Sequence, residues 1–226
     1  MYGKRGFSAG CLTGESRRFV TPTDCGVRSL GLQSNPRSLR WRIFPAPTEA
    51  NRRLPVIVIR PEQPADVPAV RAVNQAAFGQ PAEAAIVDSL RSSCGEAVSL
   101  VALEDDAVVG HIMFSPVTID GADLPMRGMG LAPMAVAPEH QRRGIGSQLV
   151  AAGIDVLSER KCPFIVVLGH PDYYPRFGFV PASRHGLRCS WDGVPDEAFL
   201  VRILDERSLR SVSGTVRYSE VFDDAL

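Results

Sequence analysis

The segment from residue 134 to residue 147 has the residue types and the spacing that most clearly suggest chemistry. It reads Met-Ala-Val-Ala-Pro-Glu-His-Gln-Arg-Arg-Gly-Ile-Gly-Ser, so an apolar strand is followed by a short turn and a helix punctuated by glycine. The first N–H groups of a helix have no partner within the helix, and with the helix dipole they attract anions. Gly144 and Gly146 would let a bulky group approach the backbone, and Arg142 and Arg143 add positive charge. The segment therefore predicts a site for a di- or polyphosphate group.

Two common phosphate-binding motifs do not fit this segment. The phosphate loop of nucleoside triphosphatases needs Gly-x-x-x-x-Gly-Lys-Ser/Thr, and no lysine stands here. The dinucleotide fingerprint needs a third glycine three residues after Gly146, where the chain has Leu149. It also needs an acidic residue after the next strand, where the chain has Gly169 and His170. Both motifs are therefore excluded, because residues that they require are missing.

The spacing Gln-x-x-Gly-x-Gly after an apolar strand resembles the acetyl-CoA-binding signature of the GNAT N-acetyltransferase superfamily. One helix and one strand later, residues 173–179, Tyr-Tyr-Pro-Arg-Phe-Gly-Phe, resemble the superfamily's Tyr-x-x-x-Gly-Phe element. Residues 166–179 and 212–218 also resemble a narrower group of bacterial N-acetyltransferases whose acceptors are mostly undefined. The resemblance leaves residues 1–54 unexplained.

The resemblance implies a role for each matching position. It implies acetyl-CoA as a cosubstrate, with no metal, and Tyr174 as the acid that protonates the leaving thiolate. The strand residues implied to pair with pantetheine are Met134, Ala135 and Val136. The turn residues implied to bind the pyrophosphate, chiefly through backbone N–H groups, are Arg142, Arg143, Gly144, Ile145, Gly146 and Ser147. Many members carry a glutamate base on the fourth strand, but residues 127–137 contain no acid, so the base stays unassigned.

The function implied by the resemblance is transfer of an acetyl group to a primary amine by direct attack in a ternary complex. The acceptor is a small molecule or a peptide, and the sequence does not decide between them. One alternative is a non-catalytic acyl-CoA-binding sensor, since the strand acid is missing; the retained Tyr174 favours catalysis. A second alternative is a nucleic-acid partner recruited by the basic residues 1–53. A homodimer is also left open.

Composition excludes several classes of partner for the main body of the chain. Residues 1–53 carry ten Lys or Arg and three Asp or Glu, whereas residues 54–226 carry fifteen and twenty-two. This acidic body argues against nucleic acid or an anionic membrane as its chief partner. No apolar stretch approaches the ~18 residues of a membrane span. The five scattered cysteines suggest neither a disulfide framework nor a metal site, so a reducing, cytoplasmic setting is expected.

The pattern along the chain predicts one folded domain over residues 55–226. Residues 1–54 show no sustained period of 2 or 3.6, and they are expected to be a disordered extension or an over-extended start. Their Arg-rich, acid-poor composition also leaves a targeting segment open. The folded part is expected to begin near Leu54, where the apolar run 55–59 sets in.

The order of elements predicts a mixed α/β (α+β) fold, which matches the GNAT-type, mostly antiparallel sheet flanked by helices and splayed between strands 4 and 5. The expected strands are 56–60, 98–103, 108–119, 129–138, 164–168, 179–180 and 199–204. The expected helices are 64–78, 82–92 and 141–160, with a short one at 173–177. The acidic residues 104–106 predict a hairpin turn, and Pro133 predicts an edge, splay or bulge.

Several other side chains are weaker candidates. Glu83 and Asp88 are expected on the second helix, which lines the acceptor cleft in the superfamily, and either could steer a cationic amine. His111 is expected to be a satisfied sheet histidine, and Tyr173 to be structural. His170 is interpreted as an exposed loop histidine. The tail residues Arg217 and Tyr218 could shape substrate access, but nothing in the sequence decides this.

Overall fold

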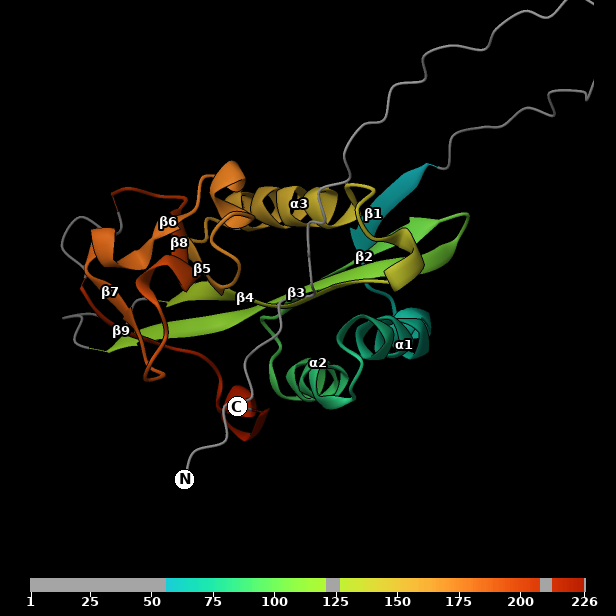
Figure 1. Ribbon diagram of the computed structural model, residues 1–226, viewed down its shortest axis with the longest axis horizontal. Helices are drawn as coiled ribbons and strands as arrows, with labels where there is room; N and C mark the ends of the chain where they lie inside the picture. Colours follow the sequence, from blue (N-terminus) through green and yellow to red (C-terminus); the bar gives the residue numbers. More distant parts are fainter. Residues whose placement is uncertain (1–55, 121–126, 208–212, 226) are drawn as a thin grey trace, which may run out of the picture. The chain divides into compact units, whose positions relative to one another are not determined.

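The computed structural model describes residues 56–120, 127–207 and 213–225 (Figure 1). The expected extension or targeting segment, residues 1–54, lies outside the described residues. The strands are β1 (Ile57–Pro61), β2 (Val98–Glu104), β3 (Ala107–Asp120), β4 (Arg127–Val136), β5 (Phe164–Leu168), β6 (Val180–Pro181), β7 (Leu187–Cys189), β8 (Phe199–Ile203) and β9 (Gly214–Arg217). The α-helices are α1 (Val67–Phe78), α2 (Ala82–Ser93) and α3 (Ile145–Glu159). Among the described residues, no helix is both long enough and apolar enough to cross a bilayer.

The nine strands of the described ranges form one sheet in the order β1-β2-β3-β4-β5-β8-β6, with β9 paired to β3 and β7 paired to β9. The pairs β4–β5 and β7–β9 are parallel, and the other pairs are antiparallel. Helix α3 covers one face of the sheet, and α1 and α2 cover the other (Figure 1). This confirms the predicted mixed, mostly antiparallel fold with flanking helices. The parallel β4–β5 pair follows from its helical connection, as expected.

The hairpin between β2 and β3 turns through two residues, as the acidic segment predicted. Asp105 and Asp106 both have positive φ, 49° and 64°. Two left-handed residues match the twist of the flanking strands, and aspartate tolerates this conformation. The turn leaves Glu104 at the end of β2, opposite Ala107.

Helix α3 begins later than the sequence predicted. The expected start near Gln141 is wrong, because residues 141–144 form a turn and α3 begins at Ile145. Gly144 at the N-cap has φ +81° and ψ 2°, a left-handed conformation that ends the turn and that glycine adopts without strain. Arg142 and Arg143 therefore belong to the turn and not to the helix.

The strands β4 and β5 diverge midway along β4. Their pairing stops at Leu131 and Val167, whereas β4 continues alongside β3 as far as Val136. The register with β3 shifts where Ala132 and Pro133 form a bulge in β4. The expected splay and bulge around Pro133 are both present. The edge of β4 that faces β5 is consequently open over residues 134–136.

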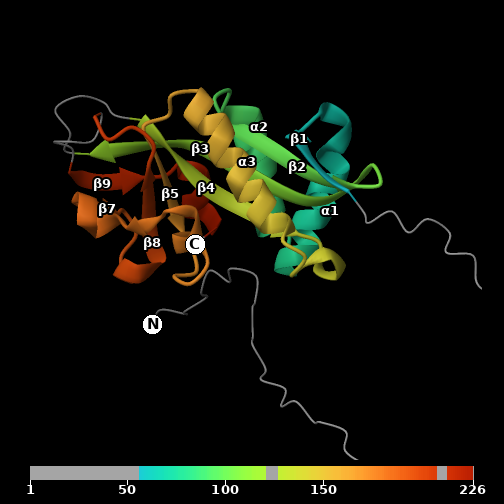
Figure 2. The same ribbon diagram turned by 90° about the horizontal axis from the view of Figure 1, so that it is seen from above.

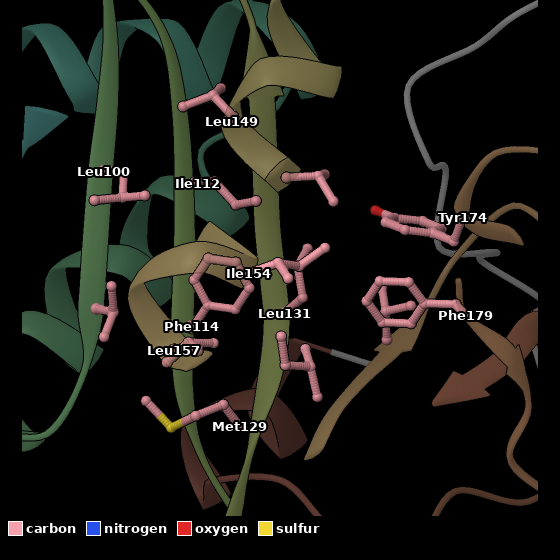
Figure 3. Packing of buried hydrophobic residues seen from close by; sticks show 14 of the residues in the cluster. Leu100, Ile112, Phe114, Met129, Leu131, Leu149, Ile154, Leu157, Tyr174 and Phe179 are labelled. Atoms are coloured by element: carbon pink, nitrogen blue, oxygen red, sulfur yellow. The ribbon is translucent and has the colours of Figure 1, made fainter. Parts of the chain in front are cut away.

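The apolar core beneath α3 is built around close contacts with the helix backbone. Figure 2 shows α3 crossing over β3 and β4. Phe114 of β3, which is fully buried, packs directly on Gly153 of α3, since a Cβ atom there would lie 2.3 Å from its ring. Tyr174 and Phe179 belong to the same cluster, and Figure 3 shows them at one side of it, with the Tyr174 hydroxyl directed toward β4.

The helix α1 crosses the opposite face of the sheet from β1 to β4. Asp66, just before the helix, is ion-paired with Arg60 of β1 at 2.6 Å. Phe78 at the other end packs with Ala135 and Ala137, at the end of β4. Because Gly79 then ends the helix with φ +70°, as the sequence predicted, the connection to α2 lies over the end of β4.

Two strands were not expected from the sequence. β7 and β9 contain only three and four residues, and they pair with each other in parallel. β9 also pairs with the far end of β3, where Ile119 lies opposite Val216. Strands this short carry little periodicity, so only their non-local pairing defines them.

Candidate functional site

The start of α3 presents a row of unpaired backbone N–H groups. The first bond of the helix runs from Gln148 N to Gly144 O, at 3.1 Å. In the described part of the chain, the N–H groups of residues 144–147 have no acceptor, and no side chain caps the helix. The side chain of Ile145 is buried in the core, so this position contributes only its backbone. Free N–H groups at the positive end of a helix form a site for an anion.

The turn before the helix adds a second concave stretch of backbone. Arg142 has φ +59° and Gly144 has φ +81°, so two left-handed residues flank Arg143. Turns of this kind direct successive N–H groups toward one point, which favours a bound anion. The predicted pyrophosphate residues are thus brought together, partly by the turn and partly by the first turn of α3.

The open edge of β4 provides free backbone groups beside this turn. Ala137 N donates to Val109 O at 2.9 Å, and alternate residues of a strand direct their polar groups to the same side. The N–H groups of Met134 and Val136 therefore point to the open edge, whereas that of Ala135 faces β3. Gln141 Nε2 donates to Val136 O at 3.0 Å, so the glutamine of the motif replaces the missing strand partner of this carbonyl.

The two arginines of the turn differ in their partners. Arg143 forms an ion pair with Glu104, with Nη1 donating to Oε2 at 3.1 Å. This pairing lowers the pKa of Glu104 and raises that of Arg143. His140 Nε2 lies 2.9 Å from the same carboxylate. Arg142 is exposed and has no ion-pair partner among the described residues, so its charge is the one available to an anion.

Gly146 faces Tyr173 and Met134 across the start of the helix. A Cβ atom on Gly146 would lie 2.9 Å from the Tyr173 hydroxyl and 3.7 Å from Met134 Sδ. The guanidinium of the exposed Arg176 stacks on the Tyr173 ring, 3.9 Å from its centroid. The structure therefore brings the strand, the helix and the tyrosine segment to one place. It gives Tyr173, which the sequence suggested was structural, a position at the anion site.

Tyr174 lies beside the same place but in the core. Its ring packs edge-on against Tyr173, at 5.0 Å between centroids, and against Gly169. The residue is 7 % exposed, and its hydroxyl has no hydrogen-bond partner in the described ranges. Burial raises the pKa of Tyr174, so the hydroxyl stays protonated at neutral pH. A neutral phenol whose hydroxyl is directed toward β4 can donate a proton.

Tyr218, which the sequence left as an undecided candidate for shaping substrate access, approaches the same region from the opposite face. Its ring covers Gly130 of β4, where a Cβ atom would lie 2.4 Å away, and stacks on Trp191 at 4.9 Å. Burial, with smaller contributions from Cys189 and Tyr174, raises the pKa of Tyr218, and the N–H of Leu168 opposes this rise. The tail segment 212–218 was a weak signal, but the position of Tyr218 depends on the pairing of β9 with β3.

The other candidates fall into two groups. Asp88 is ion-paired with Arg71 and, at 2.7 Å, with Arg91, so it is not free. His170 is exposed, as expected. His111 is fully buried and bonded to Asn74 Nδ2 and to Ser99 Oγ. Ser99 Oγ in turn donates to Glu62, so His111 is a satisfied sheet histidine as expected. Within the described ranges, no three His, Cys, Asp or Glu side chains gather as a metal-binding cluster.

Comparison with known proteins finds relatives that are described as acetyltransferases. Residues 58–182 match the model of the family described as "Acetyltransferase (GNAT) domain". The chain is 40 % identical over 168 residues to "Uncharacterized N-acetyltransferase YhbS" of Escherichia coli (strain K12), covering 74 % of this chain and 99 % of that protein. It is 42 % identical over 121 residues to "Uncharacterized N-acetyltransferase YjhQ" of the same strain, covering 52 % and 66 %.

Two solved structures are also similar. The crystal structure of YhbS from Escherichia coli in complex with CoA is 38 % identical, with a TM-score of 0.69, and the match covers 75 % of this chain and 93 % of that one. A GNAT family acetyltransferase from Brucella melitensis in complex with acetyl-CoA is 35 % identical, with a TM-score of 0.60, covering 74 % and 99 %.

Proposed function

The chain belongs to the acetyltransferase (GNAT) family, and from this premise we propose that it transfers an acetyl group from acetyl-CoA to a primary amine by direct attack, with Tyr174 as general acid. It is an acetyl-CoA-dependent N-acetyltransferase, in common with its relatives. We assign the activity to a single domain over residues 55–226.

One observation carries the proposal: the unpaired N–H groups of residues 144–147 lie next to the open edge of β4. A pyrophosphate at the helix start would accept these N–H groups, and the exposed Arg142 would balance part of its charge. The pantetheine arm is an amide chain, so it can pair with the open edge of β4 as a strand would. This arrangement directs the thioester toward the point where β4 and β5 diverge.

The chemistry then follows from the groups near that point. An alkylamine is cationic at neutral pH and first gives one proton to solvent. The neutral amine then attacks the thioester carbon, forming a C–N bond, and the carbonyl oxygen becomes an oxyanion. We assign stabilisation of this charge to the N–H of Val136, which has no strand partner. The C–S bond breaks and the thiolate takes the proton of the Tyr174 hydroxyl. The second proton lost by the amine passes to solvent and returns to Tyr174, so charge and atoms balance.

The test is calorimetric titration of the full chain with CoA and with acetyl-CoA. We expect saturable binding of both, weakened in Arg142→Gln because the charge of Arg142 is not neutralised by a neighbour. Arg143→Gln is the matched comparison and should weaken binding less, since Arg143 is already paired with Glu104. Release of free thiol from acetyl-CoA, on addition of amines, then reports turnover. Absence of heat with either carrier, in folded protein, would overturn the proposal.

A further inference from the structure

Unsatisfied oxygen atoms gather on the face of the sheet opposite α3. In the described part of the chain, four buried side-chain oxygens have no hydrogen-bond partner: Asn74 Oδ1, Glu83 Oε2, Ser115 Oγ and Tyr218 Oη. Buried polar groups in folded proteins are nearly always paired, so four such atoms on one face need an explanation. Asn74 belongs to α1, Glu83 to α2 and Ser115 to β3, whereas Tyr218 follows β9 and lies over Gly130 on the same face of the sheet.

Glu83 lies in the first turn of α2, directly after the connection from α1, whose last residue Phe78 packs at the end of β4. The connection from α1 reaches this end of β4, and α2 then returns toward β1, where Arg91 is ion-paired with Glu62 at 2.7 Å. Glu83 is 8 % exposed; Gln80 Nε2 donates to its Oε1 at 2.9 Å, and its Oε2 is left without a partner. No described cation neutralises this carboxylate. A buried, unpaired negative charge is costly unless a ligand completes it.

Ser115 and Tyr218 lie on the same face, beside the divergence of β4 and β5. Ser115 is opposite Gly130 of β4, and the Tyr218 ring and Val117 both contact the space above Gly130. Because Ser115 and Val117 are two residues apart on β3, their side chains share that face. Tyr218 also packs against the buried cluster that contains Leu90 of α2, so Tyr218 and α2 border the same region.

The chemistry of these atoms defines a ligand. All four are oxygens that can accept hydrogen bonds, and one belongs to a carboxylate, so the ligand must supply N–H or O–H donors and a positive charge. The carrier is expected on the α3 side, at the start of α3, which leaves the opposite face for the acceptor. We propose that Glu83 and Tyr218, with Ser115, form the acceptor site, and that this site takes a cationic amine carrying at least one further N–H or O–H donor.

This inference rests on the proposed function, and the test separates the two. Full-length protein is first titrated with CoA; failure here overturns the acetyltransferase proposal itself. With CoA binding established, thiol release is measured with spermidine and glucosamine, which are cationic and carry several donors, and with n-butylamine and 4-aminobenzoate. We expect the first two to be preferred. Preference for 4-aminobenzoate, or neither turnover nor calorimetric binding of the first two to the CoA-loaded protein, would overturn the acceptor assignment.

Variants then test the residues. Glu83→Gln keeps the shape of the side chain and should raise KM for spermidine by roughly 10-fold to 100-fold, the usual effect of losing a hydrogen bond to a charged group. Asp88 is also an acid on α2, but it is ion-paired with Arg71 and Arg91. Asp88→Asn should therefore leave KM for spermidine within about twofold of the unaltered protein. An unchanged KM in Glu83→Gln contradicts the assignment of Glu83.

Tyr218→Phe keeps the ring on Gly130 and removes only the hydroxyl. Because no hydrogen bond of good geometry from the described residues holds this hydroxyl, and only the N–H of Leu168 lies near it, the thermal midpoint should change little, whereas KM for spermidine should rise about tenfold. A fall in the midpoint with unchanged KM would assign Tyr218 a purely structural role and overturn its part in the proposal. This variant remains informative even where Glu83→Gln fails to fold.

Discussion

The Tyr173 hydroxyl lies 2.9 Å from the position that a Cβ atom on Gly146 would occupy. This contact joins the start of α3 to the tyrosine segment after β5, the two motifs that carried the functional interpretation. The contact also explains why position 146 is a glycine, because a side chain there would collide with the Tyr173 hydroxyl. The proposed anion site is therefore bounded by the Tyr173 ring as well as by backbone N–H groups.

Gly146→Ala should weaken CoA binding by about tenfold, as measured by calorimetry, because the methyl group displaces Tyr173 or occupies the space of the phosphate. The double variant Gly146→Ala with Tyr173→Phe separates these causes. Recovery of affinity assigns the loss to the hydroxyl collision, and no recovery assigns it to the phosphate space. An unaltered dissociation constant in the single variant would contradict both.

Tyr174→Phe should lower turnover by roughly 10²- to 10⁴-fold while leaving the CoA dissociation constant unchanged. The reason is that only the hydroxyl is removed, and the ring keeps its packing against Tyr173 and Phe179. Steady-state thiol release and calorimetry supply the two measurements. Tyr173→Phe is the control and should keep turnover within about a few-fold. Full activity in Tyr174→Phe removes this residue from the mechanism.

Gly153→Ala should destabilise the protein by about 1–2 kcal/mol, although alanine favours helices over glycine by about 1 kcal/mol. The substitution destabilises instead of stabilising because the added methyl group would lie 2.3 Å from the Phe114 ring. Urea unfolding measures the change. Adding Phe114→Leu should restore part of the loss by making room, and a stabilised Gly153→Ala protein would show that the packing beneath α3 is looser than described.

His111 should make stability depend on pH. Desolvation lowers the pKa of this fully buried side chain from 6.5 to about 3, with a smaller contribution from Arg91. Asn74 Nδ2 donates to Val70 O at 2.9 Å and to His111 Nδ1 at 3.1 Å, so the imidazole Nε2–H is left to donate to Ser99 Oγ at 2.9 Å.

The pKa of His111 is lower in the folded state, so the unfolded state binds its proton first as the pH falls. The stabilising contribution is complete above about pH 6.5 and is lost progressively toward about pH 3. Between pH 7 and pH 5 the free energy of unfolding should fall by about 2 kcal/mol more than in His111→Gln, whose amide keeps one acceptor and one donor. Equal pH dependence of the two proteins in urea unfolding would refute this.

The helices and the main strands could be predicted because their signals are local. Apolar periodicity predicted α2, β3 and β5, and the glycine spacing singled out residues 142–147, although α3 was expected to begin near Gln141 and begins at Ile145. Gly79 ended α1 where expected, since a left-handed residue stops a helix whatever surrounds it. Backbone propensity and hydrogen-bond geometry depend on neighbours in sequence, so sequence alone is sufficient for them.

Tertiary structure decided which side chains meet. The sequence could not show that Arg143 pairs with Glu104, that Tyr173 borders Gly146, or that Glu83 rather than Asp88 keeps an unpaired oxygen. The position of Tyr218 is decided by β9, a short strand whose pairing with β3 joins distant parts of the chain. Such contacts form only when segments far apart in the sequence come together and the faces of helices and sheets pack. The residues that make them show no local sequence pattern from which their partners could be predicted.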